Sequence, residues 1–268
     1  MTVFAPDGSV GRTFSVTGSP AASRVTPVGR LGTGRDASWL MMFAPDMGML
    51  GKGQARTQLF LARYTQEGAL RDTIATLPGF EVFVHDAGKG RVVPNVLFGW
   101  GTAVATTDDG FLANTGNLFE INRYTPDGRI ESIVRHTIKP RAVSAQDITD
   151  ARSAQLAFFR SPEQKALLRE AHIHMPVPLN MPAIGSTLAG RSPWIVVNES
   201  GGFWVPNFQA PSDKRAVWSI FDRGGRMYGN ISLPESFTLY EVGKDYLLGV
   251  HKDSLEVEKV MLYGLSGK

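Results

Sequence analysis

The sequence predicts an all-β fold, a β-propeller of four-stranded antiparallel blades with a short helical insertion. Two observations lead to this prediction. An aromatic residue that closes a β-like run and precedes a turn recurs along the 268-residue chain, and its first three copies lie 60 residues apart. Glycine stands four residues after the aromatic residue in the first four copies. The aromatic residues of this series are Phe4, Tyr64, Tyr124, Phe221 and Tyr263.

Each copy of this phrase has the pattern of a β-hairpin. A β-like run ends at the aromatic residue, a short turn follows, and a second β-like run begins after the glycine. Because a tight hairpin turn requires a positive φ angle, glycine is the residue expected there. The glycines of the series are Gly8, Gly68, Gly128 and Gly225.

Further β-like segments extend these hairpins to units of four strands. Counted in order, two strands lie at the N-terminus, four in each of three middle units and three at the C-terminus, 17 in all. Repeated four-stranded units are typical of a propeller, in which each blade buries both faces against its neighbours. An ordinary antiparallel domain with similar hairpins is the alternative. The equal spacing favours a single propeller domain over residues 1–268.

The segments WIVVNESGGFWV (194–205) and VWSIFDRGGRMYGNISLP (217–234) have an apolar run, a turn with glycine, and a second β-like run. They resemble the blades of bacterial six-bladed β-propellers of the NHL/TolB-like kind. The ending YLLGVHKDSLEVEKVMLYGL (246–265) is similar to the last blade of such proteins. This resemblance covers most of the chain outside residues 143–180. It implies a propeller fold in a bacterial protein and leaves the function open, because propellers host many functions.

The strand count departs from a complete propeller. About five blades are visible, the first and the last of them incomplete, and both ends carry the aromatic-turn strand. The chain is then either truncated at its N-terminus or a short and irregular propeller, and we expect the truncation. Since an open ring exposes an apolar blade face and unpaired strand edges, self-association is expected if the ring is incomplete.

Residues 143–180 interrupt the repeat and predict one or two helices between blades. Ser144 and Asp147 have the spacing of a capping box, and Ser161 followed by Pro162 has the pattern of a second helix start. The phrase MPVPLNMP after His174 predicts the end of the helical region. Such an insertion is either a lid on the propeller or an element that binds a partner or gates a substrate.

Composition excludes several functional classes. The chain has no cysteine, which excludes disulfides, thiolate metal sites and a cysteine nucleophile. Its 28 basic and 25 acidic residues are spread without a stripe of Lys and Arg, so nucleic acid is not an expected partner. No stretch is long and apolar enough for a membrane span, and the first residues show no signal peptide. The sequence does not determine the cellular compartment, which is the cytoplasm or, if the chain is truncated, an exported location.

Candidate site residues come from the loops that join second to third strands and one blade to the next, because propeller ligands usually bind where these loops meet at one end of the channel. The ligand-binding candidates are Asp46, Trp100, Asn114, Asn117, Asn207, His251, Asp253, His172 and His174. Lys52 and Asp213 lie in the same loops. The other tryptophans, Trp39, Trp194, Trp204 and Trp218, lie within β-like runs and are expected to pack between blades.

No metal site is assigned. Oxygen ligands from Asp46, Asn114 and Asn207 would suit calcium, but asparagine in tight turns usually serves the turn itself. His172 and His174 share a face only in an extended segment, and no third zinc ligand is indicated. We expect a non-catalytic scaffold that binds a protein or a small molecule. The alternatives are a calcium-dependent lactonase- or hydrolase-like propeller and a fragment without a function of its own.

Overall fold

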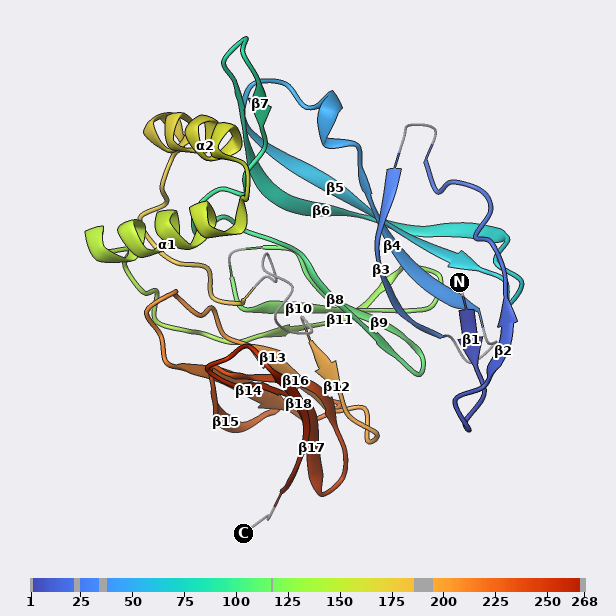
Figure 1. Cartoon of the computed structure of the whole chain (residues 1–268). Coiled ribbons are helices and arrows are strands. Elements are labelled where there is room, and N and C mark those ends of the chain that lie inside the picture. The colour runs from blue at the N-terminus through green and yellow to red at the C-terminus, as the bar shows by residue number, and fades with distance from the viewer. Residues whose placement is uncertain (1, 22–24, 34–37, 117, 186–194, 266–268) are drawn as a thin grey trace.

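The structure, a computed structural model, describes the chain except for residues 1, 22–24, 34–37, 117, 186–194 and 266–268. Its described residues form an all-β fold of five small antiparallel sheets and two α-helices (Figure 1). The sheets follow one another in chain order around a propeller-like ring, and four of them are blades of three to five strands. The fold class predicted from the sequence is therefore confirmed.

The N-terminal part contains a hairpin and the largest sheet. The hairpin is β1 (Thr2–Phe4) and β2 (Val10–Thr13). The first blade consists of β3 (Val25–Thr33), β4 (Trp39–Pro45), β5 (Gly53–Tyr64), β6 (Leu70–Asp86) and β7 (Arg91–Val92), with a short 3-10 helix, Met47–Met49, between β4 and β5.

Three smaller sheets follow. The second blade consists of β8 (Ala103–Thr107), β9 (Gly110–Asn114), β10 (Glu120–Tyr124) and β11 (Ile130–Arg135). The third consists of β12 (Val196–Val197), β13 (Phe203–Pro206), β14 (Arg215–Phe221) and β15 (Met227–Pro234). The last has β16 (Phe237–Val242), β17 (Tyr246–Lys252) and β18 (Glu258–Gly264).

The first strand of each blade lies toward the centre of the ring. β3 contacts β8, β8 contacts β12, and β12 contacts β16. The later strands pair outward in sequence order, so each blade is a simple up-and-down sheet. This is the arrangement that a radially repeated sheet requires.

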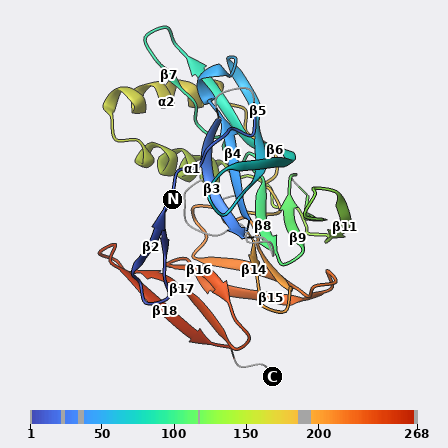
Figure 2. The same cartoon turned by 90° about the vertical axis from the view of Figure 1, so that its right-hand side faces the viewer.

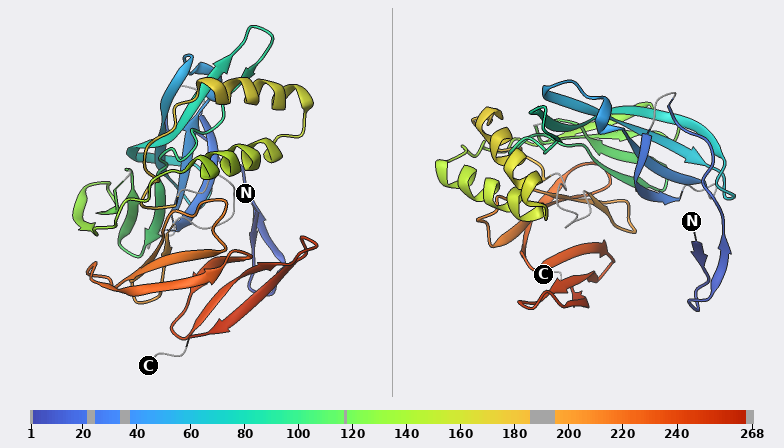
Figure 3. Two further views of the ribbon diagram at one scale, coloured as in Figure 1. Left: turned by 90° about the vertical axis from the view of Figure 1, so that its left-hand side faces the viewer. Right: turned by 45° about the horizontal axis from the view of Figure 1, so that its top comes forward.

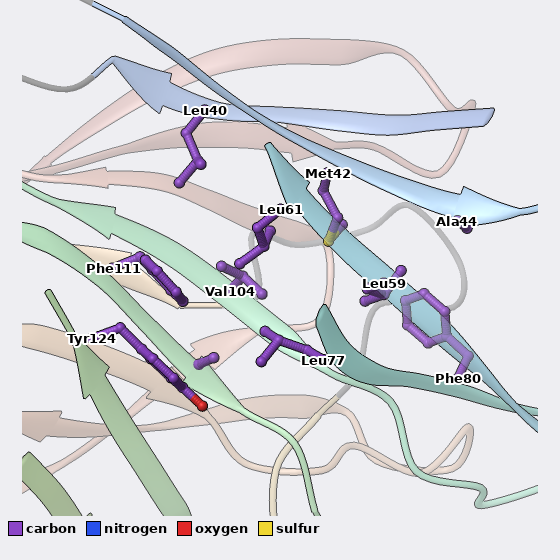
Figure 4. Packing of buried hydrophobic residues seen from close by; sticks show 11 residues of the cluster. Leu40, Met42, Ala44, Leu59, Leu61, Leu77, Phe80, Val104, Phe111 and Tyr124 are labelled. Carbon is purple, nitrogen blue, oxygen red and sulfur yellow. The ribbon is translucent and has the colours of Figure 1, made fainter. Parts of the chain in front are cut away.

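Apolar side chains fill the spaces between successive blades. Between the first two blades, Leu61 of β5 and Val104 of β8 point toward each other, and the rings of Phe111 and Tyr124 stack with their centroids 4.5 Å apart (Figure 4). Trp204 and Trp218 are buried between the third and last blades. Trp39 packs on the other face of the first blade, whereas the prediction for Trp194 falls outside the described residues.

The four hairpin turns that define the repeat share one geometry. Gly8, Gly68, Gly128 and Gly225 have φ angles of +83°, +88°, +82° and +84°. In each turn the glycine N–H donates to the carbonyl three residues earlier, for example Gly128 to Thr125 at 2.9 Å. The positive φ expected from the sequence is confirmed. Because L side chains rarely adopt this conformation, glycine is the residue that fits these positions.

The strand count differs from the predicted one. The described residues form 18 strands, because β6 runs on for 17 residues and its end pairs with the additional short strand β7. The first and last sheets of the chain are incomplete, as expected. The N-terminal hairpin packs beside the first blade, through Phe14 on Trp39, and lies apart from β16–β18 (Figures 1 and 3).

The insertion contains two helices, α1 (Ala145–Phe158) and α2 (Pro162–His174), as predicted. Ser144 and Asp147 form the expected capping box, and the two hydrogen bonds from Ser144 hold the pKa of the Asp147 carboxyl below its usual value. Ser161 accepts a hydrogen bond from the N–H of Gln164. Both helices lie at the end of the molecule away from β16–β18, and α2 packs on β6 and β7 (Figure 2). No helix in the described part of the chain is long and apolar enough to cross a membrane.

Candidate functional site

A cavity of about 990 Å³ lies between the ends of the helical insertion and the edges of the second and third blades. Four chain segments form most of its wall. They are the β9–β10 turn, the connection from β11 to α1, the connection from α2 toward β12, and the loop from β13 to β14. Trp100, in the loop that precedes β8, completes the lining.

Backbone hydrogen bonds hold these walls together. The N–H of Val143 donates to the carbonyl of Leu179 at 2.9 Å, and the N–H of Met181 donates to that of Arg141 at 2.8 Å. The two ends of the insertion therefore pair with each other. The returning segment also pairs with the third blade, because the N–H of Phe208 donates to the carbonyl of Ala183 at 3.2 Å. Backbone hydrogen bonds between these connecting segments thus shape the cavity.

The floor of the cavity is aromatic and aliphatic. Phe119 is buried and contacts the ring of His136 edge-to-face at 5.6 Å. Phe208 contacts the buried ring of Phe98 edge-to-face at 6.0 Å. Phe98 has a φ angle of +56°, which a residue with a large side chain rarely adopts. These contacts fix the orientation of the Phe119 and Phe208 rings in the cavity lining.

The rim of the cavity carries charged side chains. Arg141 donates through one nitrogen to both carboxylate oxygens of Asp213, each at 2.8 Å. Arg135 pairs with Glu120 at 2.8 Å. The Arg141–Asp213 pair joins segments 72 positions apart in the chain, whereas Arg135 and Glu120 are cross-strand partners on β11 and β10 of the second blade. The remaining basic side chains of the rim are Lys139, Lys214 and Arg215.

Two of the predicted ligand-binding residues, Trp100 and Asn207, line this cavity. The N–H of Trp100 donates to the carboxylate of Glu81 at 2.9 Å, and the guanidinium of Arg56 lies 5.8 Å from the centre of the indole ring. The side-chain oxygen of Asn207 accepts a hydrogen bond from Ser219 at 2.9 Å. Both side chains are therefore held in place by neighbours.

The other predicted loop residues serve the backbone around them. Asn114 is buried, and its amide donates to the carbonyls of Leu118 and Glu120 at 3.0 and 2.8 Å, which closes the β9–β10 turn beside the cavity. Asp46 caps the short 3-10 helix by accepting from the N–H of Gly48. Asn117 lies outside the described residues.

The histidines of the insertion point to different neighbours. His172 is buried, with its Nε2 atom 2.7 Å from Gln155 Oε1, and burial lowers its pKa to about 4. The nearby Arg152 charge acts in the same direction. The ring of His174 stacks on that of His85 at 6.2 Å. The two side chains do not converge on one point.

His251 and Asp253 lie on the last blade, away from the cavity lining. Asp253 accepts hydrogen bonds from the N–H groups of Leu255 and Val257 at 2.9 and 3.0 Å, so it organises the turn after β17. Within the described ranges, no three His, Asp or Glu side chains gather closely enough to hold a metal ion.

Sequence reasoning placed Asp213 in a candidate loop but missed the basic side chains of the rim and the aromatic floor. The phrases RHTIKPR, residues 135–141, and SDKR, residues 212–215, carry the basic side chains. The first phrase directly precedes the insertion, whereas the second lies more than 30 residues after it, in the loop between β13 and β14. Only the pairing of the insertion's two ends shows that the clusters share one cavity.

Neither the protein-family models nor the curated proteins with which the sequence was compared match it. The cavity geometry is therefore the basis for the functional argument.

Proposed function

We propose that this protein is a non-catalytic propeller scaffold that holds a ligand in the cavity beside the helical insertion. One observation carries the proposal: both ends of the insertion and loops of two blades enclose a volume of about 990 Å³ with an apolar floor and a polar rim. Pockets that bind small molecules have this size and this distribution of polarity. The insertion supplies one wall, so it is part of the contact surface.

The arrangement of the rim supports binding over covalent chemistry. Arg141 pairs with Asp213 and also, at 3.4 Å, with Asp147, and Arg135 pairs with Glu120. Among the described lining residues the one histidine is His136, whose ring packs against Phe119 and Phe221. These side chains recognise a molecule by shape, charge and hydrogen bonds.

The calcium-dependent lactonase- or hydrolase-like alternative requires several oxygen ligands at one point. Asp46, Asn114 and Asn207 lie in three different loops, and each already bonds a neighbouring group. That alternative would gain support if calcium raised the melting temperature of the protein through linkage.

We also propose membership of the six-bladed NHL/TolB-like kind. The supporting features are the blade phrases of residues 194–205 and 217–234 and the up-and-down order of the four blades, with the first strand of each at the centre. An experimental structure of the protein in its native assembly checks the number of blades.

Self-association through the last blade is a separate proposal, with a second copy of this chain as the occupant. In the β16–β18 register, Val250 lies opposite Val260, and Leu248 lies opposite Leu262. These four side chains share the face opposite the one that packs on the third blade. Val260 is 75% exposed and Leu262 is 66% exposed. This face continues the series of apolar faces that other blades bury against each other, so an equivalent face of a second copy fits it.

Cavity-filling variants test the binding proposal. Thr137 is an exposed residue of the cavity lining, and Thr149 is an exposed residue of α1 outside it. A small-molecule library is screened by thermal shift on the wild type, and each stabilising compound is repeated on Thr137→Trp and on the control Thr149→Trp. We expect Thr137→Trp to abolish the stabilisation and Thr149→Trp to keep it. Compounds that stabilise Thr137→Trp fully would place binding elsewhere and overturn the proposal.

A further inference from the structure

The charges around the cavity are unequal in number. Its lining includes five basic side chains, Arg135, Lys139, Arg141, Lys214 and Arg215, and two acidic ones, Glu120 and Asp213. The whole chain has only a small excess of basic residues, 28 against 25 acidic. Among the described residues, the cavity lining therefore carries more basic than acidic side chains.

Ion pairing leaves three of the basic side chains uncompensated. Arg141 and Arg135 pair with Asp213 and Glu120. Among the described residues, no carboxylate lies in an ion pair with Lys139, Lys214 or Arg215. The rim thus retains a net positive charge after its internal pairs are formed.

Arg215 is also oriented by its neighbours. Its Nε donates to the hydroxyl of Ser232 at 2.7 Å, and its Nη2 donates to the carbonyl of the same residue at 2.8 Å. Both acceptors are neutral, so they hold the guanidinium in place and leave its charge available. An oriented guanidinium is well suited to a carboxylate or a phosphate.

Apolar side chains lie directly beside these charges. Leu118 and Leu179 line the cavity although they are 66% and 86% exposed. Together with the buried side chains of Phe119 and Met181, they form an apolar surface, and covering it with an apolar group is favourable in free energy. A small hydrated anion would cover none of this surface, and a neutral apolar molecule would leave the three cations without a partner.

We infer that the cavity takes an amphipathic organic anion, with an apolar body on the floor and a carboxylate or phosphate directed at Lys139, Lys214 and Arg215. This inference rests on the proposed function and names the ligand class of the same site. Positive potential in a partly enclosed site raises the local concentration of anions, and apolar contact then selects among them. Binding should therefore weaken as the salt concentration rises.

Four probes with linear alkyl chains of nearly equal length test the inference by isothermal titration calorimetry at concentrations at which they form no micelles. They are decanoate, decyl phosphate, decanol and decyltrimethylammonium. We expect either anion to bind at least about tenfold more tightly than the neutral and cationic probes, which corresponds to about 1.4 kcal/mol. The comparison of decanoate with decyl phosphate distinguishes the two anionic groups.

Charge variants supply the matched control. The double variant Lys139→Ala and Lys214→Ala should weaken binding of the preferred anion about tenfold or more. The control, Lys52→Ala and Lys244→Ala, removes two exposed lysines outside the cavity lining and changes the net charge equally. It should leave the affinity within about twofold of the wild type.

The outcomes separate the inference from the proposed function. Equal binding of anionic, neutral and cationic probes, all blocked by Thr137→Trp, would overturn the anionic class and leave the binding site intact. An unchanged affinity in the Lys139 and Lys214 double variant would do the same. If no probe bound, the inference would be overturned. If the probes still bound to Thr137→Trp, the inference would be overturned and the cavity would not be the binding site.

Discussion

Arg141 donates two hydrogen bonds of 2.8 Å to the carboxylate of Asp213, which joins the start of the helical insertion to the loop between β13 and β14. The two residues are 72 positions apart in the chain. Asp213 also accepts from the N–H of Ala210 at 2.8 Å. This ion pair therefore connects two walls of the cavity and shapes one of them.

Removing either partner of this ion pair should lower the free energy of unfolding only slightly. Arg141→Ala removes this pair and also the 3.4 Å ion pair with Asp147, but because the Arg141 side chain is about half exposed the free energy of unfolding should fall by only about 1 kcal/mol. Asp213→Ala should cost about 1–2 kcal/mol, since it also removes the acceptor of the Ala210 N–H. Urea denaturation measures both variants, with Arg129→Ala as a control for an exposed pair. A larger loss in Arg141→Ala than in Asp213→Ala would contradict this ranking.

The turn glycines should differ in their tolerance of a side chain. At Gly128 a Cβ would overlap the carbonyl oxygen of Ile74 on the neighbouring blade, whereas at Gly8 it would meet nothing. Both residues have nearly the same φ, +82° and +83°. Gly8→Ala should therefore cost about 1 kcal/mol from backbone strain alone, and Gly128→Ala about 3 kcal/mol or more.

Thermal and chemical unfolding of the two glycine variants measures this difference. Gly8→Ala is the matched control, because it changes the same residue type in the same turn geometry. Equal losses in both variants would mean that the blades do not pack through this turn.

Protonation of His172 should destabilise the protein at acidic pH. Burial lowers the pKa of His172 from 6.5 to about 4 in the folded state. Between these values the unfolded chain binds more protons than the folded one, so stability falls as the pH drops from about 6.5 toward about 4. The full effect is about 3 kcal/mol.

The slope of unfolding free energy against pH in that window measures the effect of His172. His172→Gln should flatten the slope relative to the wild type, while His174→Gln, on the same helix, should keep it. Carboxylates whose pKa is lowered, such as Asp147, add a further loss at lower pH in all three proteins. An identical slope in the His172→Gln variant would exclude this histidine as the cause.

Lysines introduced on the exposed apolar face of the last blade should prevent the proposed self-association. Analytical ultracentrifugation of the wild type should show a mass that rises with concentration. The double variant Val260→Lys and Leu262→Lys should sediment as a monomer, because lysine on both chains makes the contact repulsive. Ile173→Lys, at a residue of α2 that is 76% exposed, is the control and should associate like the wild type. If the wild type were monomeric at all concentrations, the proposal of self-association would be overturned.

Calcium should leave the melting temperature unchanged if the scaffold proposal is correct. Asp46, Asn114 and Asn207 are each engaged by protein groups in separate loops, so a divalent ion finds no prepared set of oxygen atoms among them. Differential scanning calorimetry with and without millimolar calcium, and with magnesium as the control, measures the shift. An increase specific to calcium would favour the lactonase- or hydrolase-like alternative.

Short sequence patterns were sufficient to predict the turns of the blades and the start of the first helix. The turn glycine four residues after Tyr64 or Tyr124 was predictable because positive φ is a property of one residue and its immediate neighbours. The capping box at Ser144 was predictable for the same reason. The length of β6 was not, since its extension to Asp86 depends on pairing with β5 and β7.

The candidate site was only partly predictable. Trp100 and Asn207 line the cavity, whereas Asn114 turns inward to close its own turn and His172 enters the helical packing. The direction of a side chain depends on which neighbours fold against it, and a linear pattern does not contain that information.

The sequence by itself determined the repeated hairpin, its glycine turns and the position of the two helices, because each depends on contacts between residues close in the chain. Only the tertiary structure decided that the ends of the insertion pair with each other and bring Lys139 to the same cavity as Lys214. The physical reason is that a cavity is formed by distant segments, whose meeting depends on the packing of whole blades.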